Sequence, residues 1–191
     1  MKTFELSGEV RENLGKKATK AVRVSENIPC VLYGGKDNVH FTVSASAVRK
    51  LIYTPEVYVV ELTIGKNKTK AIMKELQFHA VTDKVQHIDF LEIDEKKPVV
   101  VELPVKLTGL AEGVKAGGKL SLEMRKLKVK GIYTNIPESI TVDVTNVGLG
   151  KSIQVGKLAL KDLEILNSKM SVVAQVKLTR AARGAAANAQ S

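Results

Sequence analysis

Two polar side chains near the middle of the chain have the spacing of a catalytic pair. His87 and Asp89 lie two residues apart within an alternating apolar segment. Side chains two residues apart in a β-strand project from the same face, so the carboxylate is placed to orient the imidazole for proton transfer. No nucleophile motif accompanies the pair, and we therefore favour a structural or hydrogen-bonding role over catalysis.

The other residues with metal or nucleophilic chemistry are His40, His79 and Cys30. None of the histidines stands at a metal-ligand spacing from another histidine or from the cysteine, so a zinc site is not expected. Cys30, the one cysteine, lies in an apolar segment and is expected to be a small buried hydrophobe. There is no glycine-rich phosphate loop, dinucleotide fingerprint or carboxylate pair. We expect no catalytic residue, metal, cofactor or small-molecule substrate.

A basic segment near the N-terminus points to binding instead. Between residues 11 and 23 one acid, Glu12, stands against five basic residues, for a net charge of +4. The basic residues are Arg11, Lys16, Lys17, Lys20 and Arg23. The segment has too little apolar content to bury itself, so we expect an exposed loop held between apolar strands and followed by Tyr33-Gly34-Gly35. The alternative is an ordinary solvated loop.

The composition of the whole chain supports a polyanionic partner. The 191 residues include 30 basic and 20 acidic ones, for a net charge of +10, and the pI is about 9.6. Such a charge favours nucleic acid over a membrane, because no apolar run of about 18 residues exists. Charged residues follow the first methionine closely, so no signal peptide is expected. The single cysteine agrees with a reducing compartment, and we expect a cytoplasmic protein.

Alternating apolar residues and frequent β-branched residues predict a mainly β fold. In the first half we expect strands at 31–33, 39–43, 58–64, 69–76 and 85–93, and a short helix capped by Ser46 that ends before Pro55. In the second half we expect strands at 99–107, 120–132, 140–144 and 170–177, with a loop at 109–119.

The charged stretch Asp94 to Pro98 marks a predicted domain boundary. The predicted domains are residues 1–94 and 95–180, followed by a disordered tail at 181–191 that has no large apolar residue. Residues 1–94 hold 14 basic and 12 acidic residues, a net charge of +2, whereas residues 95–191 hold 16 and 8, a net charge of +8. The first half therefore concentrates its charge in one segment, and the second is broadly basic.

The order of these motifs resembles one known family. The strings that carry the resemblance are Gly8-Glu9-Val10-Arg11, Gly15-Lys16, Arg23, Ile28-Pro29, Tyr33-Gly34-Gly35-Lys36 and Gln86-His87-Ile88-Asp89-Phe90. They resemble the bacterial large-subunit ribosomal proteins that bind 5S rRNA, the CTC or L twenty-five family. The likeness covers about the first 94 residues, and the segments 113–118 and 136–140 are similar to the C-terminal domain of the family's long form.

This resemblance implies a fold and a function. The implied fold is an N-terminal antiparallel β-barrel with short helices, similar to the anticodon-binding domain of glutaminyl-tRNA synthetase, followed by a mostly β C-terminal domain. The implied function is that of a structural constituent of the large ribosomal subunit that binds the loop E region of 5S rRNA. With Lys17 of the basic segment added, the implied RNA-binding residues are Arg11, Lys16, Lys17, Lys20, Arg23, Tyr33, Gln77, His79, His87 and Asp89.

The chemistry of these residues fits that function. An irregular RNA helix has a widened groove that side chains enter, unlike the narrow major groove of regular A-form RNA. Arginine and lysine bind phosphates, Tyr33 donates its hydroxyl or packs on a sugar, and His87 with Asp89 meets base edges or 2′-hydroxyls. Lys20 stands where the family usually has arginine, so it keeps a point charge without the planar two-pronged donor.

The implied partners are 5S rRNA and, through the C-terminal domain, neighbouring 23S rRNA or ribosomal proteins, with no membrane. The expected location is the cytoplasmic ribosome. One alternative is a basic β-domain accessory factor that binds tRNA or acts in a stress response. Another is an enzyme that uses His87 and Asp89. The identity of the bound RNA separates the first two functions, and turnover without RNA would reveal the third.

Overall fold

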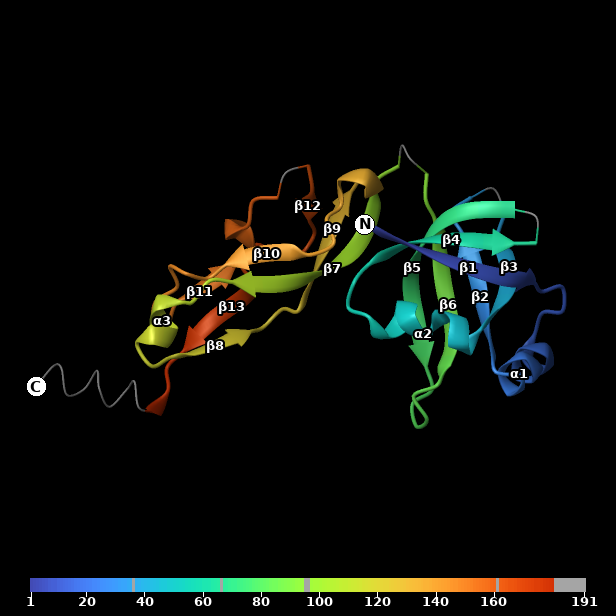
Figure 1. Ribbon diagram of the computed structural model, residues 1–191, viewed down its shortest axis with the longest axis horizontal. Coiled ribbons are helices and arrows are strands. Elements are labelled where there is room, and N and C mark those ends of the chain that lie inside the picture. The colour runs from blue at the N-terminus through green and yellow to red at the C-terminus, as the bar shows by residue number, and fades with distance from the viewer. Residues whose placement is uncertain (36, 66, 95–96, 161, 181–191) are drawn as a thin grey trace, which may run out of the picture. The chain divides into compact units, whose positions relative to one another are not determined.

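The chain folds into two compact units. The structure is a computed structural model that describes residues 1–35, 37–65, 67–94, 97–160 and 162–180. The first unit holds residues 1–99 and 132–134, and the second holds 100–131 and the chain from 135 on. The predicted mainly β fold class is confirmed (Figure 1). The domain limits at 94 and 95 stay predictions, and the predicted disordered tail at 181–191 lies outside the described residues.

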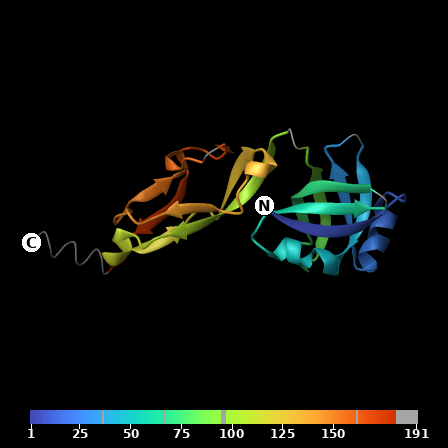
Figure 2. The same cartoon turned by 45° about the horizontal axis from the view of Figure 1, so that its top comes forward.

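The strands of the first unit close into a barrel. Around the barrel they follow the order β1-β3-β2-β6-β5-β4, and β4 pairs back onto β1 (Figure 2). The β1–β4 and β2–β6 pairs are parallel and the other neighbours are antiparallel, which refines the antiparallel barrel implied by the resemblance. The strands are β1 (Lys2–Val10), β2 (Asn27–Tyr33), β3 (Val39–Ser44), β4 (Tyr58–Ile64), β5 (Asn67–Phe78) and β6 (Val85–Glu92).

Alternating apolar residues fill the barrel, because successive side chains of a strand point to opposite faces. Phe41 and Phe90 are fully buried, and their ring centroids lie 5.7 Å apart. Cys30, paired with Phe41 across β2 and β3, is also fully buried. Burial, and secondarily the nearby Asp89, raises the pKa of its thiol. Cys30 is therefore the small buried hydrophobe that the sequence predicts.

The basic segment departs from the expected loop. Residues 16–24 form helix α1 (Lys16–Val24), and the chain enters it through Gly15, whose φ of 107° lies in the region that favours glycine. Ala18, Ala21 and the lysines are good helix formers, which explains the local conformation. The loop prediction was wrong because α1 has no buried apolar stripe to reveal it: none of its side chains is fully buried.

A second helix, α2 (Ala45–Tyr53), follows β3. Its apolar side is anchored by Val48 and Leu51, which are buried in the barrel core. The helix ends before Pro55, as predicted, but the residue at its N-cap is Ser44 and not Ser46. The two serine hydroxyls lie 2.8 Å apart and bond to each other, and the Ser44 side chain caps no backbone N–H.

The turn after β2 requires glycine. Gly34 has a φ of 98°, and a Cβ at this position would lie 2.7 Å from Cδ1 of Leu91 on β6. The positive φ makes any other residue strained, and a Cβ would also force the Leu91 side chain to shift. The Tyr33-Gly34-Gly35 motif therefore has a structural reason: it ends β2 tightly, so that Tyr33 is held at the rim of the barrel beside β6.

The second unit holds a sheet in the order β10-β7-β9-β12 and another in the order β11-β13-β8. Buried residues such as Leu103, Leu127 and Ile140 line the inner side of the first sheet, and Val144 and Val176 join a smaller apolar cluster. The strands are β7 (Val99–Thr108), β8 (Lys119–Leu122), β9 (Lys126–Gly131), β10 (Ile140–Asp143), β11 (Ser152–Gln154), β12 (Glu164–Ile165) and β13 (Val172–Lys177).

Two expectations for the second half were wrong. The strand expected at 120–132 is divided into β8 and β9, which lie in different sheets: the N–H of Glu123 still bonds to β13, whereas the carbonyl of Arg125 accepts from Val105 on β7. The loop expected at 109–119 contains a short helix, α3 (Glu112–Lys115). The short strands β11 and β12, and the 3-10 turns Tyr133–Asn135 and Val155–Lys157, were not predicted.

Candidate nucleic-acid interface

Helix α1 carries its positive charge on one side. Lys16, Lys20 and Arg23 follow each other at four- and three-residue spacings, which place them on one face of an α-helix. The half-buried residues Ala18 and Val22, four residues apart, lie on another side. Lys16, Lys17 and Lys20 are exposed, and none of them forms an ion pair with a described residue. These lysines therefore present uncompensated positive charge to solvent.

Two arginines fasten this helix to the barrel. The Nη1 group of Arg11 donates to Oγ1 of Thr19 at 3.2 Å, and its backbone N–H donates to the carbonyl of His40 at 2.9 Å. The Nε group of Arg23 donates to the carbonyl of Gln86 at 3.1 Å. Nε of Arg11 is buried with no partner among the described residues. Each of these two arginines, both predicted to bind RNA, thus uses one of its side-chain donor groups to hold α1 in place.

A row of polar residues lies on the outer face of β2, β6 and β5. In the strand register Gln77 pairs with His87, and Asp89 stands between Val31 on β2 and Glu75 on β5. Tyr33 follows Val31 by two residues and so shares its face. The barrel therefore brings together four of the predicted site residues, from strands that are far apart in sequence: Tyr33, Gln77, His87 and Asp89.

The predicted pairing of His87 with Asp89 is present. Nδ1 of His87 lies 2.7 Å from Oδ1 of Asp89, and about a quarter of each side chain is exposed (24% and 26%). Because a carboxylate accepts, Nδ1 carries a proton and donates it to this bond. In the neutral imidazole Nε2 is then a free acceptor, held in a fixed direction. The pair is suited to recognising a donor group on a ligand.

The hydroxyl of Tyr33 lies near two negatively charged residues of this face. Burial, and then the negative charges of Asp89 and Glu75, raise the pKa of its hydroxyl. The hydroxyl therefore stays protonated and able to donate. The sequence does not indicate that Glu75 belongs to this face. Its place beside Asp89 depends on the register between β5 and β6, which is irregular between Met73 and Glu75.

His79 lies apart from this row, in the loop between β5 and β6. Its Nδ1 accepts hydrogen bonds from the backbone N–H groups of Val81 and Thr82, both at 3.2 Å. Its own backbone N–H donates to the carbonyl of Lys84 at 2.8 Å. Nδ1 is therefore occupied within the loop, and Nε2 is the ring nitrogen left to meet a ligand.

Other chemistry is not supported in the described part of the chain. No group of three or more histidine, cysteine, aspartate or glutamate residues there could hold a metal ion. No helix in the same residues is long and apolar enough to cross a membrane. The arrangement, a basic helix beside a strand face with hydrogen-bonding side chains, makes these residues a candidate nucleic-acid interface.

Known proteins match both halves of the chain. Residues 6–90 match the Ribosomal L25p family, and residues 98–180 match the C-terminal domain of ribosomal protein TL5. The chain is 60% identical to large ribosomal subunit protein bL25 of Porphyromonas gingivalis, over 100% of both chains. It is 59% identical to the protein of that name from Parabacteroides distasonis, over 98% of this chain and 99% of that one.

The chain belongs to the Ribosomal L25p family. A further relative, bL25 of Bacteroides fragilis, is 54% identical over 99% of both chains. The family consists of non-enzymatic proteins of the large ribosomal subunit, which work in the cytoplasmic ribosome. The prediction of a ribosomal protein is thereby confirmed, and an enzyme built on His87 and Asp89 is excluded. The individual RNA contacts stay predictions.

Proposed function

We propose that this member of the L25p family binds the loop E region of 5S rRNA through its first unit. One observation carries the proposal: the hydrogen bond from Arg23 to the carbonyl of Gln86 ties the basic helix to strand β6. The next residues of that strand include His87 and Asp89. A phosphate-binding face and a hydrogen-bonding face are therefore held together on one scaffold.

Helix α1 supplies the part of the binding that does not depend on sequence. Lys16, Lys17 and Lys20 are exposed and unpaired among the described residues, so they are free to neutralise phosphates. Arg23 keeps its two Nη groups for the same purpose while Nε holds the helix in place. Phosphate contacts of this kind fix the orientation of the protein on RNA without selecting a base.

The row of polar residues on the outer face of β2, β6 and β5 supplies the selectivity for one RNA over another. Asp89 and Glu75 are negative and repel phosphates, so this part of the surface favours sugars and base edges. Nε2 of His87 accepts, the Tyr33 hydroxyl donates and the Gln77 amide does both, which suits 2′-hydroxyls and base edges in a widened groove. We therefore assign discrimination between RNAs to Tyr33, Gln77, His87 and Asp89.

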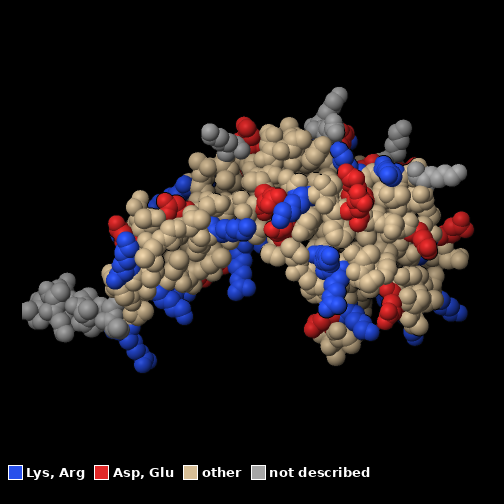
Figure 3. Space-filling view, viewed as in Figure 1, with Lys and Arg blue, Asp and Glu red and all other residues tan. Residues whose placement is uncertain are grey.

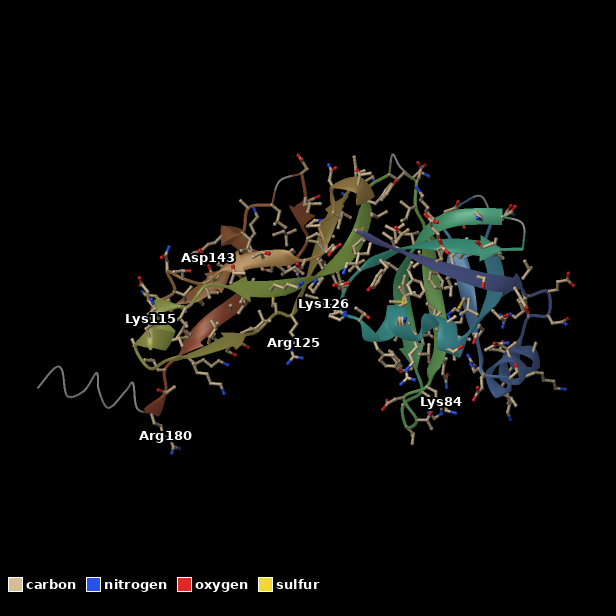
Figure 4. The ribbon with its side chains drawn as sticks, viewed as in Figure 1. Lys84, Lys115, Arg125, Lys126, Asp143 and Arg180 are labelled. Carbon is tan, nitrogen blue, oxygen red and sulfur yellow. The ribbon has the colours of Figure 1, made fainter. Side chains whose placement is uncertain are left out.

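We further propose that the second unit contacts neighbouring 23S rRNA or ribosomal proteins. On the outer side of its sheet, Lys128 and Lys130 pair with Glu102 and Glu164 at 3.6 and 3.7 Å. Lys126, by contrast, is exposed and forms no ion pair with a described residue (Figure 4). Unpaired charge of this kind, in a half of the chain with a net charge of +8, favours an anionic neighbour.

The test is to identify the RNA that remains bound when the full-length protein is purified from cells at moderate salt. We expect sequencing of that RNA to show enrichment of 5S rRNA over its share of total RNA. Enrichment of tRNA would support the accessory-factor alternative and contradict the proposal.

A further inference from the structure

A groove opens at one end of the barrel. It is separate from the row of polar residues on the outer face of β2, β6 and β5. It is bounded by the end of α1, by α2 and by the loop between β5 and β6. Of the predicted RNA-binding residues only Arg23 and His79 line it. The groove is therefore continuous with the proposed site at Arg23, but most of its lining has no assigned role.

The lining of this groove is positively charged. Arg49 comes from α2, Lys84 from the β5–β6 loop and Arg23 from α1, against a single acid, Glu26. Lys84 projects from the loop below the barrel in Figure 4, and Figure 3 shows basic side chains gathered at this end of the unit. Arg49 and Lys84 are exposed, and neither forms an ion pair with a described residue. The charge is thus available to a ligand.

An exposed aromatic ring lies in the same groove. Tyr53, the last residue of α2, is 66% exposed, although it is a large hydrophobic residue. Apolar side chains, including Ile28 and Ile52, complete the lining beside it. A nucleobase stacks on such a ring whatever its identity, because every base has a π-face. Cations around an exposed aromatic residue are the combination that binds unpaired nucleotides.

We infer that this groove is a second RNA-binding site. It takes an unpaired nucleotide next to the RNA strand whose phosphates α1 binds. Arg49 and Lys84 bind its phosphates, and Tyr53 stacks on its base. RNA is favoured as the occupant because Arg23 lines the groove and also lies on the phosphate-binding face of α1. The inference rests on the proposed function, since it extends the surface for the same RNA.

The test compares groove variants of the full-length protein in titrations with 5S rRNA at several salt concentrations. The double variant Arg49→Gln/Lys84→Gln should reduce the log-log salt slope by about 1.4 to 1.8, at roughly 0.7 to 0.9 per phosphate contact. Tyr53→Ala should weaken binding roughly 5- to 150-fold, the loss for one stacked base, and Tyr53→Phe should bind like the wild type. Lys68→Gln, an exposed site at the start of β5 away from the groove, is the control for the loss of a single surface charge and should change the slope little.

The results separate this inference from the proposed function. If the double variant keeps the wild-type slope and Tyr53→Ala keeps the wild-type affinity, the groove is not an RNA site, even when the wild type prefers 5S rRNA. If the wild type has no such preference, the proposed function fails. The groove then stands only if the same variants weaken binding to an unrelated structured RNA. Thermal melts of each variant establish that it is folded.

Discussion

Arg23 on helix α1 donates its Nε–H to the carbonyl oxygen of Gln86 on strand β6, at 3.1 Å. Sixty-three residues separate the two in sequence. Because Gln86 immediately precedes His87, this bond connects the helix that carries the lysines to the strand that carries the His87–Asp89 pair. The two kinds of RNA contact proposed for this protein are therefore parts of one surface.

Lys16→Ala should change how binding depends on salt. Four or five phosphate contacts from Arg11 and α1 should contribute roughly −3 to −4 to the log-log slope, apart from any contribution of the groove, and loss of one contact should make the slope shallower by about 0.7 to 0.9. Titration of 5S rRNA at several salt concentrations measures the slope. Lys68→Ala, which removes an exposed lysine from β5, should leave it unchanged. A folded Lys16→Ala protein with the wild-type slope would remove Lys16 from the site.

His87→Ala should reduce selectivity and leave the salt slope almost unchanged, because base or hydroxyl contacts release few counterions. Loss of one or two hydrogen bonds of about 1 kcal/mol each predicts a roughly 5- to 30-fold smaller preference for 5S rRNA over an unrelated structured RNA. Thr63→Ala, a change on strand β4 of the same barrel, is the control. Undiminished selectivity in a folded His87→Ala protein would exclude a role for His87 in recognition.

A fragment of residues 1–94 should fold and bind 5S rRNA with most of the affinity of the full chain. The strands and helices of the barrel all lie within this range, and so does every residue of the proposed site. Circular dichroism checks folding, and titration checks binding. A folded fragment that binds a hundredfold more weakly, a loss of roughly 2.7 kcal/mol, would show that the second unit takes part in 5S rRNA binding.

The stability of the chain should depend on pH through Glu123. Hydrogen bonds from Lys177, Gln175 and Ser121, each 2.8 Å, lower the pKa of Glu123 from 4.5 to about 2. Since the pKa is lower in the folded state, the stabilisation is present above the unfolded pKa and is lost as the pH falls from about 5 to about 2.

Melting temperatures of the wild type and Glu123→Gln measure this dependence. The wild type should melt higher near neutral pH, and the difference should shrink to nothing as the pH falls through that window. A difference that stays constant from neutral pH to about pH 2 would show that the carboxylate charge contributes no stability. Glu61→Gln, at an exposed acid on strand β4 of the other unit, is the control.

Sequence alone predicted those elements whose signal is local. The alternation from Tyr58 to Ile64 and from Val99 to Leu107 has the period of a strand, and both strands are present. The spacing of His87 and Asp89 likewise placed both side chains on one face, because a strand repeats every two residues.

Three features of the structure were not predicted: helix α1, the break between β8 and β9, and the groove beside Tyr53. Helix α1 buries no side chain fully, and its less exposed side is made of small residues such as Ala18 and Val22, so the basic residues dominate its sequence as they do in a solvated loop. The break between β8 and β9 did leave a signal: apolar residues stand at Leu120 and Leu122 but then at Leu127 and Val129, so the alternation shifts by one residue. The groove beside Tyr53 exists only because segments distant in sequence meet.

The central claim is that the protein selects 5S rRNA from other structured RNAs. The most direct measurement is a titration of the full-length protein with 5S rRNA and with tRNA, at one salt concentration and under identical conditions. The account predicts that 5S rRNA binds at least about tenfold more tightly, a difference of roughly 1.4 kcal/mol. Equal affinities for the two RNAs, or tighter binding of tRNA, would contradict it.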